Sequence, residues 1–163
     1  MEEQIKAVQR MQDYIKDNLG ENITLSDLSK VSYFSPWYSY RLFMQWVNLT
    51  PADYIRRFRL SKSALKLRDE KCKISDIAFE VGFKSVDGYQ RAFFKEFGCN
   101  PREYALNPVP IYLFTPYNVK SKYMRRNKTV KEVKTIFIQT IEKPERKVII
   151  KKELRQRKIL KLQ

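Results

Sequence analysis

The stretch Leu25-Ser26-Asp27-Leu28 returns 49 residues later as Ile74-Ser75-Asp76-Ile77. With one more residue in the turn that follows, an offset of 50, the two copies share five further residues: Ser35 and Ser85, Arg41 and Arg91, Phe43 and Phe93, Pro51 and Pro101, and Tyr54 and Tyr104. Each copy reads as a short helix, a turn and a second helix, which is the pattern of a helix-turn-helix. The repeat therefore predicts two helix-turn-helix units in one chain.

Capping residues mark where the predicted helices begin. Thr24 and Thr50 each precede an aspartate by three residues, which is the capping-box pattern. The pair Ser35-Pro36 supplies the cap and the first-turn proline that open a helix. The predicted helical elements are an amphipathic helix over 2–19, helix-turn-helix units over about 24–47 and 73–97, a linker helix over about 51–68 and a short helix over about 101–106.

The pattern changes in the last third of the chain. Pro108, Pro110 and Pro116 forbid a continuous helix. Thr135–Ile141 and Lys147–Ile150 are β-branched and apolar and are separated by a turn, which is typical of a β-hairpin. Two strands alone rarely bury enough surface to be stable.

The predicted fold class is therefore mainly α, with two helix-turn-helix units joined by a long linker helix and followed by a short, incomplete hairpin-like segment. We expect three parts. Residues 1–106 form the helical domain, 107–134 a linker, and 135–163 the hairpin-like remnant with a basic tail.

The charge of the chain is strongly positive but unevenly placed. The net charge is +15, which favours a polyanionic partner. Residues 1–108 hold 17 basic and 14 acidic side chains, whereas 109–163 hold 16 basic and 4 acidic ones. Nucleic-acid binding by the repeats must therefore depend on where individual charges lie. The net charge alone would instead assign nucleic-acid binding to the tail.

Composition also excludes several protein classes. The chain has no histidine, and its two cysteines, Cys72 and Cys99, cannot supply the four ligands of a zinc finger. We find no catalytic motif, so we expect no enzyme (a cysteine-based DNA repair protein included), no metal and no cofactor. The acidic, polar start is unlike a signal peptide, and no apolar run approaches the roughly 20 residues of a membrane helix. We expect a cytoplasmic protein without a membrane partner.

The second helix of a helix-turn-helix enters the major groove of DNA while the first braces it. We therefore expect DNA contacts from these helices and their starts: in the first unit Ser35, Trp37, Tyr38, Tyr40, Arg41 and Gln45, and in the second Lys84, Ser85, Val86, Asp87, Gly88, Gln90, Arg91 and Lys95. Arginine bonds guanine and glutamine bonds adenine bidentately, at about 1–3 kcal/mol of discrimination each. The serine caps begin helices whose free N–H groups can meet phosphate.

Several of these residues have a structural alternative. Trp37 could belong to the core, Arg41 and Arg91 could form ion pairs that stabilise the fold, and Asp87 could serve the start of its helix. Gly88 could permit a close approach to DNA. The charges of the linker helix form either a solvated face or DNA-backbone contacts: Arg56, Arg57, Arg59, Lys62, Lys66 and Arg68. The expected core consists of Leu25, Leu28, Val31, Phe34, Leu42, Phe43, Ile74, Ile77, Phe83, Phe93 and Phe97.

The span from Thr24 to Tyr104 resembles the AraC/XylS family of bacterial transcription regulators. The resemblance is carried by Ile74-Ser75-Asp76-Ile77-Ala78-Phe79-Glu80-Val81-Gly82-Phe83-Lys84-Ser85, by Arg91-Ala92-Phe93 and by Gly98-Cys99-Asn100-Pro101-Arg102-Glu103-Tyr104. It implies seven helices, two recognition helices in successive major grooves, and regulation through RNA polymerase.

The first unit departs from the family pattern at two positions. Tyr33 stands where the family often has a turn glycine, and Ser39 stands where a buried leucine is usual. The packing of the first unit, and with it the groove contacts of its second helix, is therefore less well defined by the resemblance than that of the second unit.

A weaker likeness covers the following segment. Asn107–Phe114 and Thr135–Ile138 resemble the join to, and first hairpin of, a GyrI-like effector-binding domain, as in Rob-like regulators. Such a domain needs more chain than follows here. We expect a truncated domain without a complete pocket for a small-molecule effector.

Two functions from different classes remain after this reading. The favoured one is a sequence-specific transcription regulator that binds double-stranded DNA at an asymmetric site. The alternative is a sequence-independent binder of nucleic acid or of an anionic surface, driven by the basic C-terminal tail.

Overall fold

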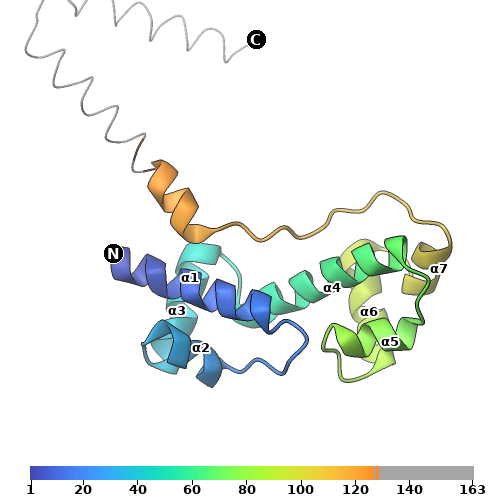
Figure 1. Ribbon diagram of the computed structural model, residues 1–163, viewed down its shortest axis with the longest axis horizontal. Helices are drawn as coiled ribbons and strands as arrows, with labels where there is room; N and C mark the ends of the chain where they lie inside the picture. The colour runs from blue at the N-terminus through green and yellow to red at the C-terminus, as the bar shows by residue number, and fades with distance from the viewer. Residues whose placement is uncertain (127, 129–163) are drawn as a thin grey trace, which may run out of the picture. The chain divides into compact units, whose positions relative to one another are not determined.

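The computed structural model describes residues 1–126 and 128, and all regular structure in this part of the chain is helical (Figure 1). Residues 1–120 form one compact body. Its helices are α1 (Glu2–Asp17), α2 (Leu25–Ser32), α3 (Pro36–Val47), α4 (Pro51–Asp69), α5 (Ile74–Glu80), α6 (Val86–Phe97) and α7 (Pro101–Leu106). A further helical segment covers 119–126. The mainly helical fold is confirmed, whereas the predicted hairpin lies outside the described residues.

The predicted caps form the hydrogen bonds that their sequence pattern implies. The Thr24 hydroxyl accepts a bond from the Asp27 backbone N–H at 3.2 Å, and the Asp27 carboxylate accepts one from the Thr24 N–H at 3.0 Å. The Thr24 bonds hold the pKa of Asp27 below its usual range. Thr50, Ser35 and Ser85 accept similar bonds at the starts of α4, α3 and α6. The helix starts are thus local products of the sequence.

The core of the first helix-turn-helix unit is built on α1. This helix packs against both α2 and α3. The contact buries apolar side chains from all three helices: Ile5, Met11, Ile15, Leu28, Leu42 and Phe43. In the second unit α4 packs in the same way against α5 and α6, and the cluster there includes Leu60, Leu67, Ile77, Tyr89, Phe93 and Tyr104.

The internal repeat consequently has three helices per copy. The offset of 49 residues that relates α2 to α5 also places α1 on α4, and it pairs Ile5 with Tyr54, Arg10 with Arg59, Met11 with Leu60, Gln12 with Ser61 and Ile15 with Ala64. The paired residues other than the arginines are all buried. We call α1–α3 the first repeat and α4–α6 the second repeat. The repeat in the sequence did not reveal that α1 and α4 are equivalent, because few of their paired side chains are identical.

Residues 107–120, the return segment, run from α7 back along α4 to α1 (Figure 1). The Phe114 N–H donates to the Ser61 hydroxyl at 2.7 Å. Gln12 donates its amide to the Tyr117 carbonyl at 3.0 Å and accepts from the Val119 N–H at 3.3 Å. Two paired polar residues of the repeats, buried on α1 and α4, therefore hold this segment. The linker predicted over 107–134 begins inside the compact body.

The two departures of the first repeat from the family pattern have local explanations. Tyr33 has φ 61°, in the left-handed region where glycine is favoured, and the guanidinium of Arg10 lies 4.8 Å from the centre of its ring. Ser39 is buried, and its hydroxyl lies 2.6 Å from that of Ser32. Hydroxyl pairing thus replaces apolar packing at this point between α2 and α3.

Most of the residues predicted to form the core are buried or partly buried, and one of them, Leu25, is exposed. Leu28, Phe43, Ile77 and Phe93 are buried. Leu25 is 37% exposed, because it is the first residue of α2, where the capping turn leaves it beside solvent. Leu42 is also buried, and the rest of the predicted core is partly buried: Val31, Phe34, Ile74, Phe83 and Phe97.

Candidate nucleic-acid interface

Helix α3 presents an exposed polar and aromatic face. Trp37 is 67% exposed, so the core alternative for this residue is wrong. Its ring stacks on Tyr40 with centroids 5.8 Å apart and planes 11° from parallel. Arg41 and Gln45 are also exposed, and Trp37, Arg41 and Gln45 follow one another at intervals of four, which places them on one side of the helix.

Tyr38 lies on another side of α3. Its hydroxyl accepts a hydrogen bond from the Gln4 amide at 2.8 Å, and its ring meets Phe34 edge-on at 5.0 Å. The bond from Gln4 uses the hydroxyl oxygen as an acceptor, so its O–H still has a proton to donate. Ser35, the cap of α3, remains exposed at the start of the helix.

Helix α6 presents the matching face in the second repeat. The exposed residues from this part of the predicted set are Lys84, Ser85, Asp87, Gln90, Arg91 and Lys95, while Val86 and Gly88 are half-buried. Tyr89 and Phe93 are fully buried. These two aromatic anchors fix the rotation of α6 and turn Gln90 and Arg91 outward.

Gly88 has a structural role at the start of α6. Its N–H donates to the Ser85 hydroxyl at 3.1 Å, and a Cβ at this position would lie 2.9 Å from that oxygen. A side chain at this position would therefore require the Ser85 hydroxyl to shift. This reason is independent of the close approach to DNA that the sequence suggested.

Arg41 and Arg91 hold equivalent positions and are both unengaged. Each side chain is exposed, and within residues 1–126 and 128 neither forms an ion pair or a side-chain hydrogen bond. The ion-pair alternative therefore has no support in the described part of the chain. Two unpaired guanidinium groups at matched places on two helices are suited to an external anionic or hydrogen-bonding partner.

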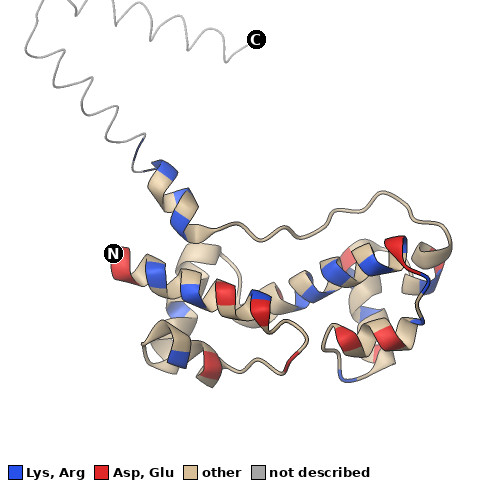
Figure 2. Ribbon diagram, in the orientation of Figure 1, with Lys and Arg blue, Asp and Glu red and all other residues tan. Residues whose placement is uncertain are grey.

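The basic residues of α4, visible in Figure 2, mostly have an intramolecular partner. Arg57 pairs with Glu96 of α6 at 3.2 Å, and Lys66 pairs with Glu80 of α5. Arg56 pairs with Asp53, and Arg68 pairs with Asp69. Arg59 bonds to backbone carbonyls. Of the six, Lys62 alone is exposed without a partner in the described residues. The side chains in ion pairs remain 33–49% exposed, so most charges of α4 lie in ion pairs at the surface of the protein.

Two arginines that the sequence analysis did not assign as a pair hold the ends of equivalent helices. Arg10 of α1 donates to the carbonyls of Val31 and Ser32 at 2.8 and 2.9 Å, at the end of α2. Arg59 of α4 donates to the carbonyl of Gly82 at 2.9 Å, after the end of α5. The sequence could have revealed this pair, since the two arginines are 49 residues apart, which is the offset of the repeat.

Comparison with known proteins supplies the identity of this arrangement. A family profile described as a helix-turn-helix domain matches residues 28–107. The regulatory protein SoxS of Escherichia coli strain K12 is 31% identical over 99 residues, which are 61% of this chain and 92% of SoxS. The chain belongs to the AraC family of transcription regulators. This AraC-family protein is accordingly a DNA-binding transcription regulator, and the expectation that it is not an enzyme agrees with its family.

Other relatives differ in length. The protein TetD of transposon Tn10 from Escherichia coli is 35% identical over 96 residues, which cover 59% of this chain and 70% of TetD. A putative regulator of Escherichia coli strain K12, YkgA, is 33% identical over 99 residues. The match spans 61% of the AraC-family chain but 41% of YkgA. The likeness therefore concerns the helical domain.

Solved structures share the fold. The C-terminal domain of the response regulator AraT from Geobacillus stearothermophilus superposes with a TM-score of 0.59 at 24% identity, covering 68% of this chain and 89% of that one. The DNA-binding domain of AdpA, solved in complex with a target DNA, gives 0.58 at 18% identity, covering 61% and 89%. At these identities the likeness shows the fold alone. No helix in the described part of the AraC-family chain is long and apolar enough to cross a membrane.

Proposed function

We propose that this protein reads one asymmetric DNA site with two recognition helices, α3 and α6, each in its own segment of the major groove. The observation that carries the proposal is the matched pair of exposed, unpaired arginines, Arg41 and Arg91. Each follows a serine-capped helix start by six residues, where free N–H groups favour a phosphate. The DNA complex of the AdpA domain, which shares the fold, supports the same kind of ligand.

The two helices differ in the chemistry that they offer to base edges. Aligned by the offset of 50, Trp37 corresponds to Asp87, Tyr40 to Gln90 and Gln45 to Lys95. The aromatic stack of α3 favours contact with thymine methyl groups, and Gln90 with Arg91 favours adenine and guanine. The two half-sites should therefore differ in sequence, which makes the site asymmetric.

Selection from a random DNA library tests the proposal. The full chain is incubated with random duplexes at physiological salt, and the bound fraction is sequenced. We expect enrichment of one motif with two unlike blocks about one helical turn, or about 34 Å, apart. Enrichment of a single block, or of a palindrome, would contradict reading by two different helices of one chain.

The basic C-terminal tail supports a second candidate, sequence-independent binding by charge. This candidate predicts no enriched motif and a steep salt dependence that vanishes when the tail is removed. Comparing the full chain with residues 1–126 separates the two, because residues 1–120 contain both recognition helices and the return segment that packs on α1 and α4. Under the favoured proposal the shorter chain keeps the motif and loses only part of its affinity.

We further propose that the protein acts on chromosomal DNA in the cytoplasm and affects RNA polymerase at nearby promoters. The family membership supports this role. Transcription in vitro from a template that carries the selected motif, with purified polymerase, should change in rate when the protein is added. No change at saturating protein would remove polymerase from the proposed partners while leaving DNA binding intact.

A further inference from the structure

At one place the backbone of the first repeat lies directly against the backbone of the second repeat, with no side chain between them. The connector between α1 and α2, residues 18–24, lies against the turn that follows α5. A Cβ on Gly20 would lie 2.8 Å from the carbonyl oxygen of Glu80, and a Cβ on Gly82 would lie 2.7 Å from the carbonyl oxygen of Gly20. Gly82 also has φ 87°, which side chains disfavour. Glycine at both positions therefore allows this contact.

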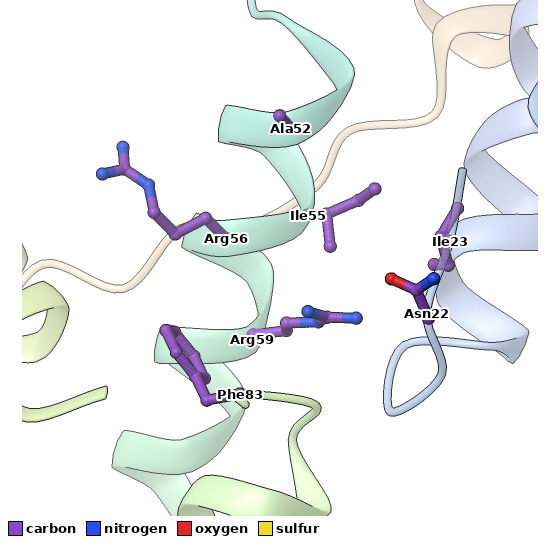
Figure 3. Close-up of a pocket in the computed structure, with 7 residues that line it drawn as sticks. All are labelled: Asn22, Ile23, Ala52, Ile55, Arg56, Arg59 and Phe83. Carbon is purple, nitrogen blue, oxygen red and sulfur yellow. The ribbon is translucent and has the colours of Figure 1, made fainter. Parts of the chain in front are cut away.

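Arg59 of α4 bonds to both sides of this contact. Its Nε donates to the Leu19 carbonyl at 2.8 Å and its Nη2 to the Glu21 carbonyl at 2.5 Å, both in or next to the connector. Its Nη1 donates to the Gly82 carbonyl at 2.9 Å, in the turn of the second repeat. Figure 3 shows the side chain extending from α4 toward Asn22, beside Phe83, whereas Arg56 points away.

The chemistry of this contact requires an arginine. The planar guanidinium has five N–H donors in a fixed fork and serves three carbonyl oxygens in different directions, which a lysine ammonium on a flexible stem cannot reproduce. Partial burial lowers the pKa of Arg59, yet the group stays charged at neutral pH because arginine ionises far above it. The three carbonyl dipoles offset the cost of its lost hydration.

We propose that Arg59 fixes the distance and rotation between the two recognition helices and so determines which spacing of the two DNA blocks the protein accepts. The inference rests on the proposed two-helix reading. Helix α6 begins at Val86, four residues after Gly82, so the Arg59 contact holds the turn that leads directly into it. On the other side, the connector leads into α2, which packs against α3.

Apart from Arg59, the two recognition helices are connected through α4, which packs against both α3 and α6 and whose Tyr54 ring meets Phe43 of α3 at 5.2 Å, and through the short link that precedes α4. That link includes Asn48, whose φ of 60° marks a sharp change of direction. The return segment ties α4 to α1 but makes its hydrogen bonds away from the turn at Gly82. The Arg59 contact is thus the place where the second helix-turn-helix turn is held to the first repeat.

Changing the spacing by one base pair displaces a block by about 3.4 Å and rotates it by about a tenth of a turn. A protein whose recognition helices are fixed relative to each other cannot contact both blocks after this displacement. A protein whose helices can move relative to each other can. Affinity of the full chain is measured for the duplex that the wild-type chain selects, and for duplexes with one base pair inserted or removed between the blocks. We expect the wild-type chain to lose about tenfold in affinity on either change, the typical cost of one disrupted base contact.

The substitution Arg59→Lys should compress this ratio to about threefold or less, while affinity for the selected duplex itself falls. The fall reflects the entropy of the freed hinge, and the smaller ratio shows that the helices now adjust to each spacing. A purely structural role would lower affinity for all three duplexes by the same factor. The ratio therefore separates positioning from stability.

Gly82→Ala provides an independent test from the opposite side of the contact, because its Cβ would collide with the Gly20 carbonyl and with Arg59. Arg56→Gln is the matched control: it lies on the same helix, points away from the contact (Figure 3) and pairs with Asp53 of α4 itself, so the spacing ratio should stay at the wild-type value. Thermal unfolding of each variant verifies that it is folded.

Failure of the inference and failure of the proposed function give different results. A wild-type chain that selects no two-block motif would overturn the proposed function. A wild-type chain with a strong spacing preference, together with folded Arg59→Lys and Gly82→Ala variants that keep the same ratio, would overturn the inference alone. If one of the two variants does not fold, the spacing ratio of the other still tests the inference.

Discussion

Two pairs of arginines occupy equivalent positions in the two repeats, one pair at the surface and one pair bonded within the fold. Arg41 and Arg91 are identical, exposed and unpaired, yet Arg41 follows Trp37 by four residues and Arg91 follows Asp87 by four, which places each pair on one side of its helix. Arg10 and Arg59, by contrast, both bond to carbonyls at or just after the end of the first helix of a helix-turn-helix. The surroundings of the exposed arginines differ between the repeats, whereas the internal arginine contacts are shared.

Replacing the recognition arginines one at a time should affect one DNA block each. Arg41→Ala should relax sequence preference in one block of the selected motif and Arg91→Ala in the other, each by about 1–3 kcal/mol, since each removes one base contact. Repeating the library selection with each variant measures this. Lys62→Ala, an exposed substitution on α4, is the control and should leave both blocks unchanged. Equal loss in both blocks from either arginine variant would contradict separate reading.

Two buried tyrosines should make the protein sensitive to alkaline pH. Burial raises the pKa of Tyr54 and of Tyr89 from 10.0 to about 12. Unfolded phenols ionise near pH 10, while the folded ones resist until near pH 12, so stability that is fully present below pH 10 is lost between these values. The loss should be roughly 2–3 kcal/mol for each tyrosine.

Urea unfolding at a series of pH values up to 12 checks this prediction. Tyr89→Phe should cost about 1 kcal/mol at neutral pH, because the Tyr89 hydroxyl donates to Ser63 at 3.1 Å. The same variant should show a smaller alkaline loss than the wild-type chain, because Tyr54 remains, as does Tyr104, whose pKa burial also raises. An unchanged alkaline loss in Tyr89→Phe would mean that other groups cause it.

At the scale of elements, the helices were predictable because their starts depend on neighbouring residues. Thr24, Ser35, Thr50 and Ser85 all cap the helices that their sequence context indicated. The equivalence of α1 and α4 was not predicted, since Ile5 and Tyr54 share burial rather than identity. The set of exposed residues on α3 and α6 followed from the repeat, but the engagement of the α4 charges depends on distant partners such as Glu96.

The repeat also identifies a helix with an improvable start. Helix α5 has Lys73 at the position equivalent to Thr24, without a side-chain cap bond. Lys73→Thr would place a hydroxyl three residues before Asp76, as Thr24 is placed before Asp27, and would remove a positive charge from a helix N-terminus. We expect stabilisation of about 1 kcal/mol, measured as a higher urea midpoint. Thr24→Ala, which removes the existing cap, should shift the midpoint in the opposite direction.

At the scale of the whole molecule, the return segment makes the compact body larger than its helical domain. The prolines of this segment showed that no helix continues, but an extended chain has no periodicity that tells where it will pack. Phe114 reaches the ring of Tyr54 at 5.2 Å, and Val119 is buried. These contacts cover α1 and α4, the first helices of the two repeats.

Truncation should reveal this contribution. Residues 1–106 should unfold with a stability roughly 2–4 kcal/mol lower than residues 1–126, because Phe114 and Val119 leave their sites and Gln12 and Ser61 lose partners. Urea unfolding of both chains measures the difference. Equal midpoints would mean that 107–120 behaves as a free linker. Phe114→Ala in the full chain should reproduce part of the loss without any truncation.

The course of the return segment also determines how a mechanical load would pass through the protein. The chain leaves the compact body at Lys120, whose N–H donates to Gln9 of α1 at 3.3 Å. The N-terminus belongs to the same helix, so tension applied between the two ends acts first on the bonds between α1 and residues 117–120. The segment would peel away residue by residue before α4 or either recognition helix carried any force. A protein under strain at its C-terminal side would thus keep its reading surface intact.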